Sequence, residues 1–229
     1  MTSSRLPGKV MLEVGGRSLL EIHLHRLARS GFPVVIATTE NTTDDPIIAL
    51  ANSLGIPFVR GSEADVLSRF WLAAETFKAE HIVRVTSDCP LIDGELIGSA
   101  ALEYLNLAES PCYLSNCEHR TFPRGLDFEI FPTSALMTAQ KNAVDASDRE
   151  QVTPYIKAQI PGLVHRHFQD SENFSQWRLT VDQHEDFKLL KILIEDFHAD
   201  QLSYPALKAL LKSQPNLAQL NAHIEQKKV

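Results

Sequence analysis

Short apolar runs alternate with amphipathic stretches along most of the chain. The runs Val34–Thr38, Ile56–Arg60 and His81–Thr86 are rich in β-branched residues and predict buried strands. Between them the apolar residues recur at helical spacing, as Leu19, Leu20, Leu24 and Leu27 do before Gly31. This alternation is typical of an α/β fold in which helices cover both faces of a mostly parallel sheet.

Two predicted strands end in an aspartate. Asp88 closes the run that starts at His81 and is followed by Pro90, and Asp182 closes the run Trp177–Val181. Carboxylates at the ends of strands are suitable ligands for Mg²⁺, which takes one or two of them together with substrate phosphates. Local alternatives remain open, because Asp88 can form an Asx-turn and Asp182 can start a capping box with Glu185. Asp93 is expected to cap a helix.

The segment Leu6–Lys9 predicts a tight turn near the start of the chain. Pro7 fixes its own φ and Gly8 tolerates a positive φ, so the turn holds Arg5 and Lys9 close together. Two cations beside free backbone N–H groups suit a polyphosphate. The alternative is a surface turn with two solvated basic residues.

Composition narrows the possible functions. The 229 residues contain 22 Lys+Arg and 29 Asp+Glu, and a net charge of −7 argues against general binding to nucleic acid or to a membrane surface. Cys89, Cys112 and Cys117 have no CxxC spacing, so neither a disulfide framework nor a zinc ribbon is expected. No apolar run approaches about 18 residues, and a cytoplasmic location without a membrane span or signal peptide is expected.

Residues 110–132 contain charged side chains between short extended pieces. Arg120 and Arg124 are candidates for bidentate binding of a carboxylate, although Arg124 also fits an exposed turn. Asp127 and Glu129 alternate with apolar residues and therefore lie on one face of a strand. For Glu129, a solvated sheet edge is an equally good interpretation.

Four motifs, in this order, resemble one enzyme family. They are Ser3–Lys9 with its continuation to Glu21, the run ending at Asp88, the stretch Ser147–Ile156, and Trp177–Phe187 with its Leu-Thr-Val-Asp. Together they resemble the cytidylyltransferases that make CMP-activated acidic sugars, particularly the spore coat polysaccharide (SpsF-type) branch, which is related to the acylneuraminate and Kdo cytidylyltransferases.

The resemblance implies a single Rossmann-like nucleotidyltransferase domain over residues 1–229, with residues 110–132 on the acceptor side and in a dimer contact. It implies that Arg5 and Lys9 are catalytic and that Asp88 and Asp182 bind Mg²⁺. The nucleotide would be bound by Ser3, Arg5, Gly8, Lys9, Arg60, Gly61, Ser62 and Asp88. The sugar would be bound by Arg120, Arg124, Asp127 and Arg149. A separate interpretation of Ser62 is a capping box with Asp65.

The reaction implied is transfer of CMP from CTP to an acidic, keto-acid type sugar, with release of pyrophosphate, for surface polysaccharide biosynthesis. The resemblance also implies a homodimer. Two departures from the family stand out. Gln151 replaces the usual histidine, and the first strand, with an arginine, is expected before Met1. The alternatives are a glycosyltransferase of the same layered (GT-A) architecture and an inactive nucleotide-binding protein.

Overall fold

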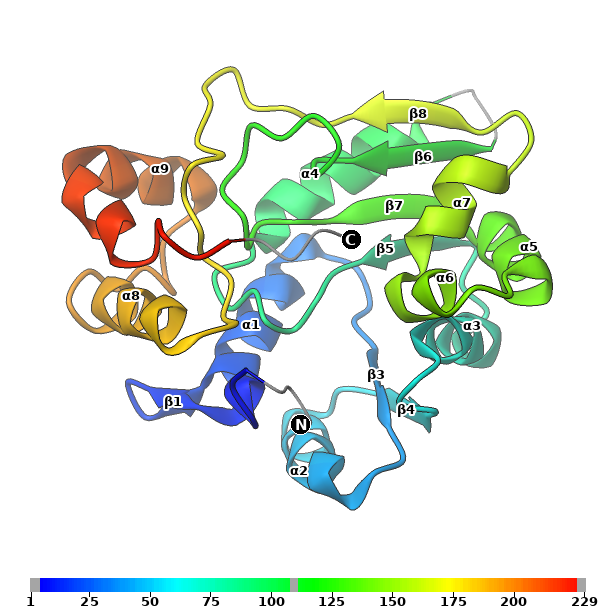
Figure 1. Cartoon of the computed structure of the whole chain (residues 1–229), viewed down its shortest axis with the longest axis horizontal. Coiled ribbons are helices and arrows are strands. Elements are labelled where there is room, and N and C mark those ends of the chain that lie inside the picture. The colour runs from blue at the N-terminus through cyan, green and yellow to red at the C-terminus, as the bar shows by residue number, and fades with distance from the viewer. Residues whose placement is uncertain (1–4, 108–110, 226–229) are drawn as a thin grey trace.

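The computed structural model describes residues 5–107 and 111–225, so the predicted nucleotide contact of Ser3 lies outside the described residues. Figure 1 shows strands and helices alternating along the chain. The strands are β1 (Glu13–Val14), β2 (Arg17–Ser18), β3 (Ile36–Thr39), β4 (Phe58–Gly61), β5 (His81–Arg84), β6 (Cys112–Ser115), β7 (Glu129–Pro132) and β8 (Val164–His167).

The helices follow the same alternation. They are α1 (Leu19–Leu27), α2 (Asp45–Leu54), α3 (Val66–Phe77), α4 (Gly94–Leu105), α5 (Thr133–Asn142), α6 (Ala146–Gln151), α7 (Thr153–Gln159), α8 (His184–Glu195) and α9 (Tyr204–Ser213). The 3₁₀ helices are η1 (Lys9–Met11), η2 (Ala28–Ser30), η3 (Thr42–Asp44) and η4 (Pro215–Leu220). None of the helices among the described residues is long and apolar enough to cross a membrane.

The predicted α/β class is confirmed, and the sheet is mixed rather than mostly parallel. β3 and β4 form a parallel pair, while β5, β7, β6 and β8 form a four-stranded sheet in that order. Within that sheet β6 and β8 are parallel, but β7 runs antiparallel to both of its neighbours. The expected parallel pattern fails here because the segment joining β6 to β7 contains no helix and returns the chain in the opposite direction.

Helices cover both faces of the four-stranded sheet, as predicted. Leu114 and Ile130 pack with α4 on one face, which lies behind the sheet in Figure 1. Tyr113 and Phe131, one residue along each strand, pack with α3, α5 and α7 on the other. The alternation of side chains along a strand produces this division.

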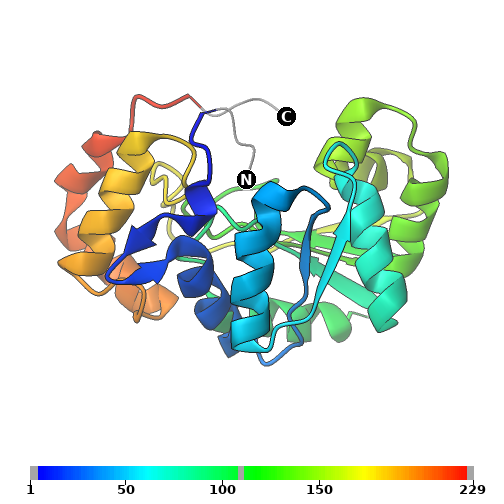
Figure 2. The ribbon, with the colours of Figure 1, turned by 90° about the horizontal axis from the view of Figure 1, so that it is seen from below.

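The amino-terminal segment packs against the carboxy-terminal helices. Leu19 and Ile22 of α1 share a core with Leu189 and Leu193 of α8 and with Leu207 of α9. Figure 2 shows the blue amino-terminal segment beside the orange and red helices. This contact brings the loop before α1 next to the segment that leads into α8.

Of two helix caps that the sequence predicts, one is confirmed and the other is wrong. Asp93 caps α4 through the backbone N–H of Leu96 (2.8 Å), as expected. The cap of α3 is Asp65, whose carboxylate accepts from the N–H of Ser68 (2.9 Å), and the prediction that Ser62 caps this helix is wrong. Because α3 starts at Val66, only the residue directly before it can reach the free N–H groups.

The segment before α8 is not a regular strand. Among the described residues it makes an isolated parallel bridge between Arg178 and Arg124, so its partner is a loop and not a sheet. Helix α8 starts at His184, with Gln183 and Asp186 forming the capping box. The box predicted one residue earlier, from Asp182, is therefore wrong, which leaves the Asp182 carboxylate available for other contacts.

Candidate functional site

Lys9 projects from a tight turn, as the sequence predicts. Its N–H donates to the carbonyl of Leu6 (3.3 Å), and Gly8 sits at a φ of 68°, in the left-handed region that favours glycine. Helix η1 starts directly after Gly8. The turn therefore fixes where the Lys9 side chain begins.

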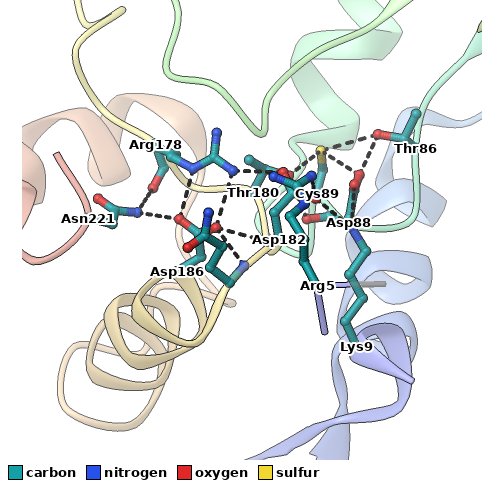
Figure 3. Close-up of polar contacts among 11 residues, drawn as sticks. Arg5, Lys9, Thr86, Asp88, Cys89, Arg178, Thr180, Asp182, Asp186 and Asn221 are labelled. Carbon is teal, nitrogen blue, oxygen red and sulfur yellow. Dashed lines mark hydrogen bonds and ion pairs between the residues drawn. The ribbon is translucent and has the colours of Figure 1, made fainter. Parts of the chain in front are cut away.

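The Lys9 ammonium joins two carboxylates that are far apart in the sequence. Lys9 Nζ donates to Asp88 Oδ2 (2.8 Å) and to Asp182 Oδ1 (2.8 Å), while the Arg5 guanidinium lies 3.0 Å from Asp182 Oδ1 (Figure 3). The structure thus brings four of the predicted site residues into one cluster, which we call the Lys9 cluster. Their roles toward nucleotide and metal remain predictions.

Electrostatics within the cluster favour the charged forms of Lys9 and Asp182. Burial opposes the charge on Lys9, but Asp88 and Asp182 outweigh it and raise the lysine pKa above its usual value. Burial likewise opposes the charge on Asp182, and Lys9, Arg178 and Arg5 together lower the pKa of that carboxyl. Lys9 and Asp182 are therefore both charged at neutral pH.

Asp88 is held from both its backbone and its side chain. Its carbonyl accepts from the N–H of Val181 (2.8 Å) and the hydroxyl of Thr180 (3.2 Å), which ties the end of the β5 segment to the segment before α8. Its Oδ1 accepts from the Thr86 hydroxyl (2.6 Å). The Asp88 carboxylate therefore points to Lys9.

Arg178 is a site residue that the sequence reasoning missed. It is buried, and its guanidinium donates to Asp182 Oδ2 (2.7 Å) and to Asp186 Oδ1 (2.9 Å). Asn221 donates to the same Asp186 oxygen (2.8 Å). The available signal was an arginine inside the apolar run Trp177–Val181, because a buried cation needs a carboxylate partner. Arg178 fixes the orientation of Asp182.

The residues present fit a hard divalent cation. Oxygens of Asp88 and Asp182 converge on one point, where the Lys9 ammonium now lies at 2.8 Å from each. Among residues 5–107 and 111–225, no group of three or more His, Cys, Asp or Glu side chains could hold a metal ion. Two carboxylates completed by phosphate oxygens and water form the kind of site that Mg²⁺ takes.

A pocket of about 640 Å³ opens beside Asp88, and three of the four predicted sugar-binding residues line it. Arg120 binds Asp127 through two hydrogen bonds of 2.5 and 2.9 Å. Arg124 is anchored by its backbone, since its N–H donates to the Trp177 carbonyl (2.9 Å). Within the described part of the chain, the Arg124 guanidinium has no ion-pair partner, and burial together with nearby Arg120 lowers its pKa.

The floor of this pocket holds a buried carboxylate. Glu129 is only 6% exposed, which excludes the solvated-edge interpretation. It pairs with Arg84 (2.5 Å) and accepts from Thr153 (2.9 Å) and from the Tyr113 hydroxyl. Burial raises the pKa of Glu129, but Arg84 and the hydroxyls more than compensate and keep it below the usual value. Lys157 and Gln151 also line the pocket.

The predicted base and ribose contacts lie at the end of β4. Arg60 donates to the carbonyls of Thr39 and Asn41 (2.8 Å each) and pairs with Asp45 (2.9 Å), so it supports the loop after β3. Gly61 lies against Arg69, and Ser62 is exposed. None of the three lines the pocket beside Asp88.

Arg149 is also separate from that pocket. It binds the Asp65 carboxylate through two nitrogens and donates to the Gln140 carbonyl (3.1 Å), so it joins α6 to the start of α3. The structure gives Arg149 a packing role between helices. Its predicted contact with the acceptor sugar stays a prediction.

Comparison with known proteins agrees with this geometry. The family model described as cytidylyltransferase matches residues 1–229. The spore coat polysaccharide biosynthesis protein SpsF of Bacillus subtilis is 33% identical over 229 residues, which cover 95% of this chain and 93% of that protein. An uncharacterized protein of Methanocaldococcus jannaschii is 37% identical over 230 residues, covering 98% and 92%.

A solved structure supports the same family assignment. A cytidylyltransferase from Leptospira borgpetersenii superposes with a TM-score of 0.89 at 34% identity and covers 99% of this chain and 95% of its own. The resemblance inferred from the motifs is confirmed. The chain therefore belongs to the cytidylyltransferase family and is a nucleotidyltransferase.

Proposed function

We propose that the chain transfers CMP from CTP to the anomeric hydroxyl of an acidic sugar and releases pyrophosphate. The observation that carries the proposal is the position of the Lys9 cluster at the edge of the 640 Å³ pocket, with Asp88 belonging to both. The family supports the nucleotide half of the reaction. The name of the Bacillus relative supports a sugar as acceptor.

In this reaction the acceptor oxygen attacks the α-phosphorus of CTP. A new P–O bond forms, the bond between the α-phosphorus and its bridging oxygen breaks, pyrophosphate departs, and the hydroxyl proton is released. Lys9 and Arg5 would bind the phosphate oxygens and neutralise the charge that develops on the leaving group. Holding both reactants at adjoining sites would contribute further to the rate enhancement, because it brings the reacting atoms together in the correct orientation.

Mg²⁺ is part of the proposal, held by Asp88 and Asp182. When bound, it would act as a Lewis acid on the phosphate oxygens and neutralise their charge. Arg178 would keep Asp182 in the orientation that binding requires, because it holds the other carboxylate oxygen at 2.7 Å. Thr86 would do the same for Asp88.

The acidic character of the sugar is supported by the charges in the pocket. The planar guanidinium of Arg124 is available for a bidentate contact with a carboxylate. Arg120 already forms a bidentate pair with Asp127. The Asp127 oxygens are acceptors for sugar hydroxyls. A neutral sugar would leave the Arg124 cation desolvated without a partner.

Pyrophosphate release tests the proposal directly. The chain is incubated with Mg²⁺, each of the four nucleoside triphosphates and a panel of keto-acid and neutral sugars. We expect release with CTP and a keto-acid sugar, and loss of release in Asp88→Asn and Lys9→Met but not in Asp196→Asn, an exposed aspartate at the end of α8. Equal release with neutral sugars, or release of a nucleoside diphosphate instead, would contradict it.

The homodimer belongs to the same proposal and follows from the resemblance, while the cytoplasmic location is proposed from the cysteine pattern of the sequence. Sedimentation equilibrium of the purified chain gives its molar mass in solution and so tests whether it forms a dimer. A monomer at micromolar concentration would remove this part of the proposal and leave the reaction untouched.

A further inference from the structure

The turn between α6 and α7 holds a strained backbone. Val152 follows α6 and precedes α7, and it has a φ of 73° with a ψ of −53°. In the part of the chain that the structure describes, it is the one β-branched residue among the non-glycine residues with positive φ, which are Lys78, Val152 and His198. Such a backbone is unfavourable for valine and persists only where the surrounding structure imposes it.

Contacts on both sides of Val152 impose this conformation. Its N–H donates to the Asp148 carbonyl (3.0 Å), which closes the end of α6. Its side chain is fully buried in a core that contains Tyr113. The next residue, Thr153, donates its hydroxyl to the buried carboxylate of Glu129 (2.9 Å). The turn is therefore fixed relative to the floor of the acceptor pocket.

The residues that flank Val152 line that pocket. Gln151, Thr153 and Lys157 all belong to the lining of the cavity of about 640 Å³. Within residues 5–107 and 111–225 the Lys157 ammonium has no ion-pair partner, yet it is close enough to Glu129 to help lower the pKa of that carboxyl. Strained backbone is concentrated at binding and catalytic sites, where the rest of the fold supports it. Here it places a cation and an amide on one wall of the pocket.

This wall lies away from the reacting end of the pocket. Asp88 marks the reacting end, and Arg124 belongs to it because its backbone bridges to the segment before α8. Glu129 pairs in register with Arg84, four residues before Asp88, and four residues span at most about 13 Å. Figure 1 shows the chain after β5 running away from α6 and α7 toward α1 and α8. Lys157 therefore faces the part of an acceptor that lies farthest from Asp88.

We propose that the α6–α7 turn selects the acceptor at its remote end, with Lys157 and Gln151 binding polar substituents of the sugar and Val152 positioning them. The inference rests on the proposed function and extends it, because it requires an acceptor that continues well beyond its keto-acid end. An ammonium group donates hydrogen bonds and an amide both donates and accepts them, which suits sugar hydroxyls. The keto-acid end lies at Asp88 and Arg124.

Ligand-observed NMR titration without nucleotide tests the role of Lys157. The probes are Kdo and N-acetylneuraminic acid, two keto-acid sugars. We expect Lys157→Met to weaken binding by at least about tenfold, the loss that follows from removing a hydrogen bond from a charged donor. Saturation transfer should fall at the remote carbons of the sugar more than at the methylene beside its keto-acid end. Lys157→Arg should retain most of the affinity, because it keeps the charge.

The matched control is Lys141→Met, which removes an exposed lysine from the last turn of α5 and should bind as the unaltered chain does. Unchanged binding in Lys157→Met would overturn the proposal, and so would saturation transfer that falls equally at both ends of the sugar. In either case the acidic acceptor of the proposed function still stands. If the unaltered chain binds neither sugar, that acceptor fails too and this inference falls with it.

Val152→Gly and Val152→Ala test the strained turn. Both remove the buried side chain, but glycine adopts a φ of 73° without strain. We therefore expect the glycine variant to unfold at the higher temperature, the reverse of the usual order, and to bind Kdo more weakly than the unaltered chain because the turn is no longer fixed. A lower midpoint for glycine than for alanine, or unchanged binding of Kdo, would contradict the positioning role of Val152. Should neither variant fold, Lys157→Met decides the proposal alone.

Discussion

Replacing Lys9 with methionine would remove the cation that lies between Asp88 and Asp182 while keeping most of the apolar stem. The lysine side chain is only 16% exposed, and the two aspartate side chains are 25% and 11% exposed. Solvent therefore screens the lost contacts only in part. The variant separates the electrostatic role of Lys9 from the packing of the turn.

The size of the effect follows from the contacts. A hydrogen bond to a charged group contributes roughly 1.5–3 kcal/mol, and Lys9 makes one at 2.8 Å with each carboxylate. Arg5 and Arg178 still neutralise Asp182, so the two contributions do not add fully. We expect Lys9→Met to lower the free energy of unfolding by about 2 kcal/mol, or about 4–8 °C in the midpoint.

We also expect Mg²⁺ to stabilise the same variant in the absence of nucleotide. Without Lys9, Asp88 and Asp182 repel one another and become available to a divalent cation. With a dissociation constant of about 1 mM, about 10 mM Mg²⁺ would restore ~1.4 kcal/mol to the variant. In the unaltered chain the ammonium competes for the same oxygens, so the gain should be smaller.

The assay is thermal and urea unfolding with and without Mg²⁺. Lys191→Met is the matched control, because Lys191 is exposed and lies 3.9 Å from Glu195 in a surface pair. The double variant Lys9→Met/Asp88→Asn should lose the Mg²⁺ response. If Lys9→Met is as stable as the control and gains nothing from Mg²⁺, the two aspartates do not form one cation site and the reasoning fails.

Four further outcomes are expected. Gly125→Ala should cost at least about 2 kcal/mol in urea unfolding, since φ is +100° there and a Cβ would lie 2.5 Å from the backbone of Leu179. Asp170→Asn should cost about 2 kcal/mol at pH 7, because contacts lower the pKa of Asp170 to about 2; this difference should shrink as pH falls from about 4 to 2 in urea titrations. Arg178→Leu should cost roughly 3–5 kcal/mol in thermal melts, since it leaves a fully buried carboxylate without its cation. Arg124→Gln should raise the KM for the acidic acceptor roughly tenfold or more in steady-state kinetics, with the KM for CTP unchanged.

The parts of the fold and site that the sequence predicted are those encoded within one segment. The β-branched run before Asp88 and the Pro-Gly turn before Lys9 each specify a local conformation. Strands in an α/β sheet present their carboxyl ends on one side, so a strand-end aspartate near a cationic turn could be expected. The α/β class follows from the same local patterns.

The parts that could not be predicted depend on contacts between segments. Glu129 alternates with apolar residues as an edge residue would, and only the neighbouring Arg84 and Tyr113 make it a buried charge. Arg149 was assigned to the acceptor sugar because its segment resembles a family motif, yet in the structure its partner is Asp65, more than eighty residues away. The pattern of residues within one segment carries no information about partners that lie in other segments of the chain.

Asp182 lies in the Lys9 cluster for a different structural reason from the one that the sequence suggested. The sequence suggested the end of a strand, but the carboxylate is positioned by loop contacts, namely the bond from Val181 N–H to the Asp88 carbonyl and the clamp from Arg178. The Asp88 backbone is thus tied to Val181, the residue directly before Asp182, which couples the positions of the two aspartates. Binding of a cation between them therefore depends on the packing of α8 as well as on the end of β5. Destabilising α8 should lower the affinity for the cation before it unfolds the sheet.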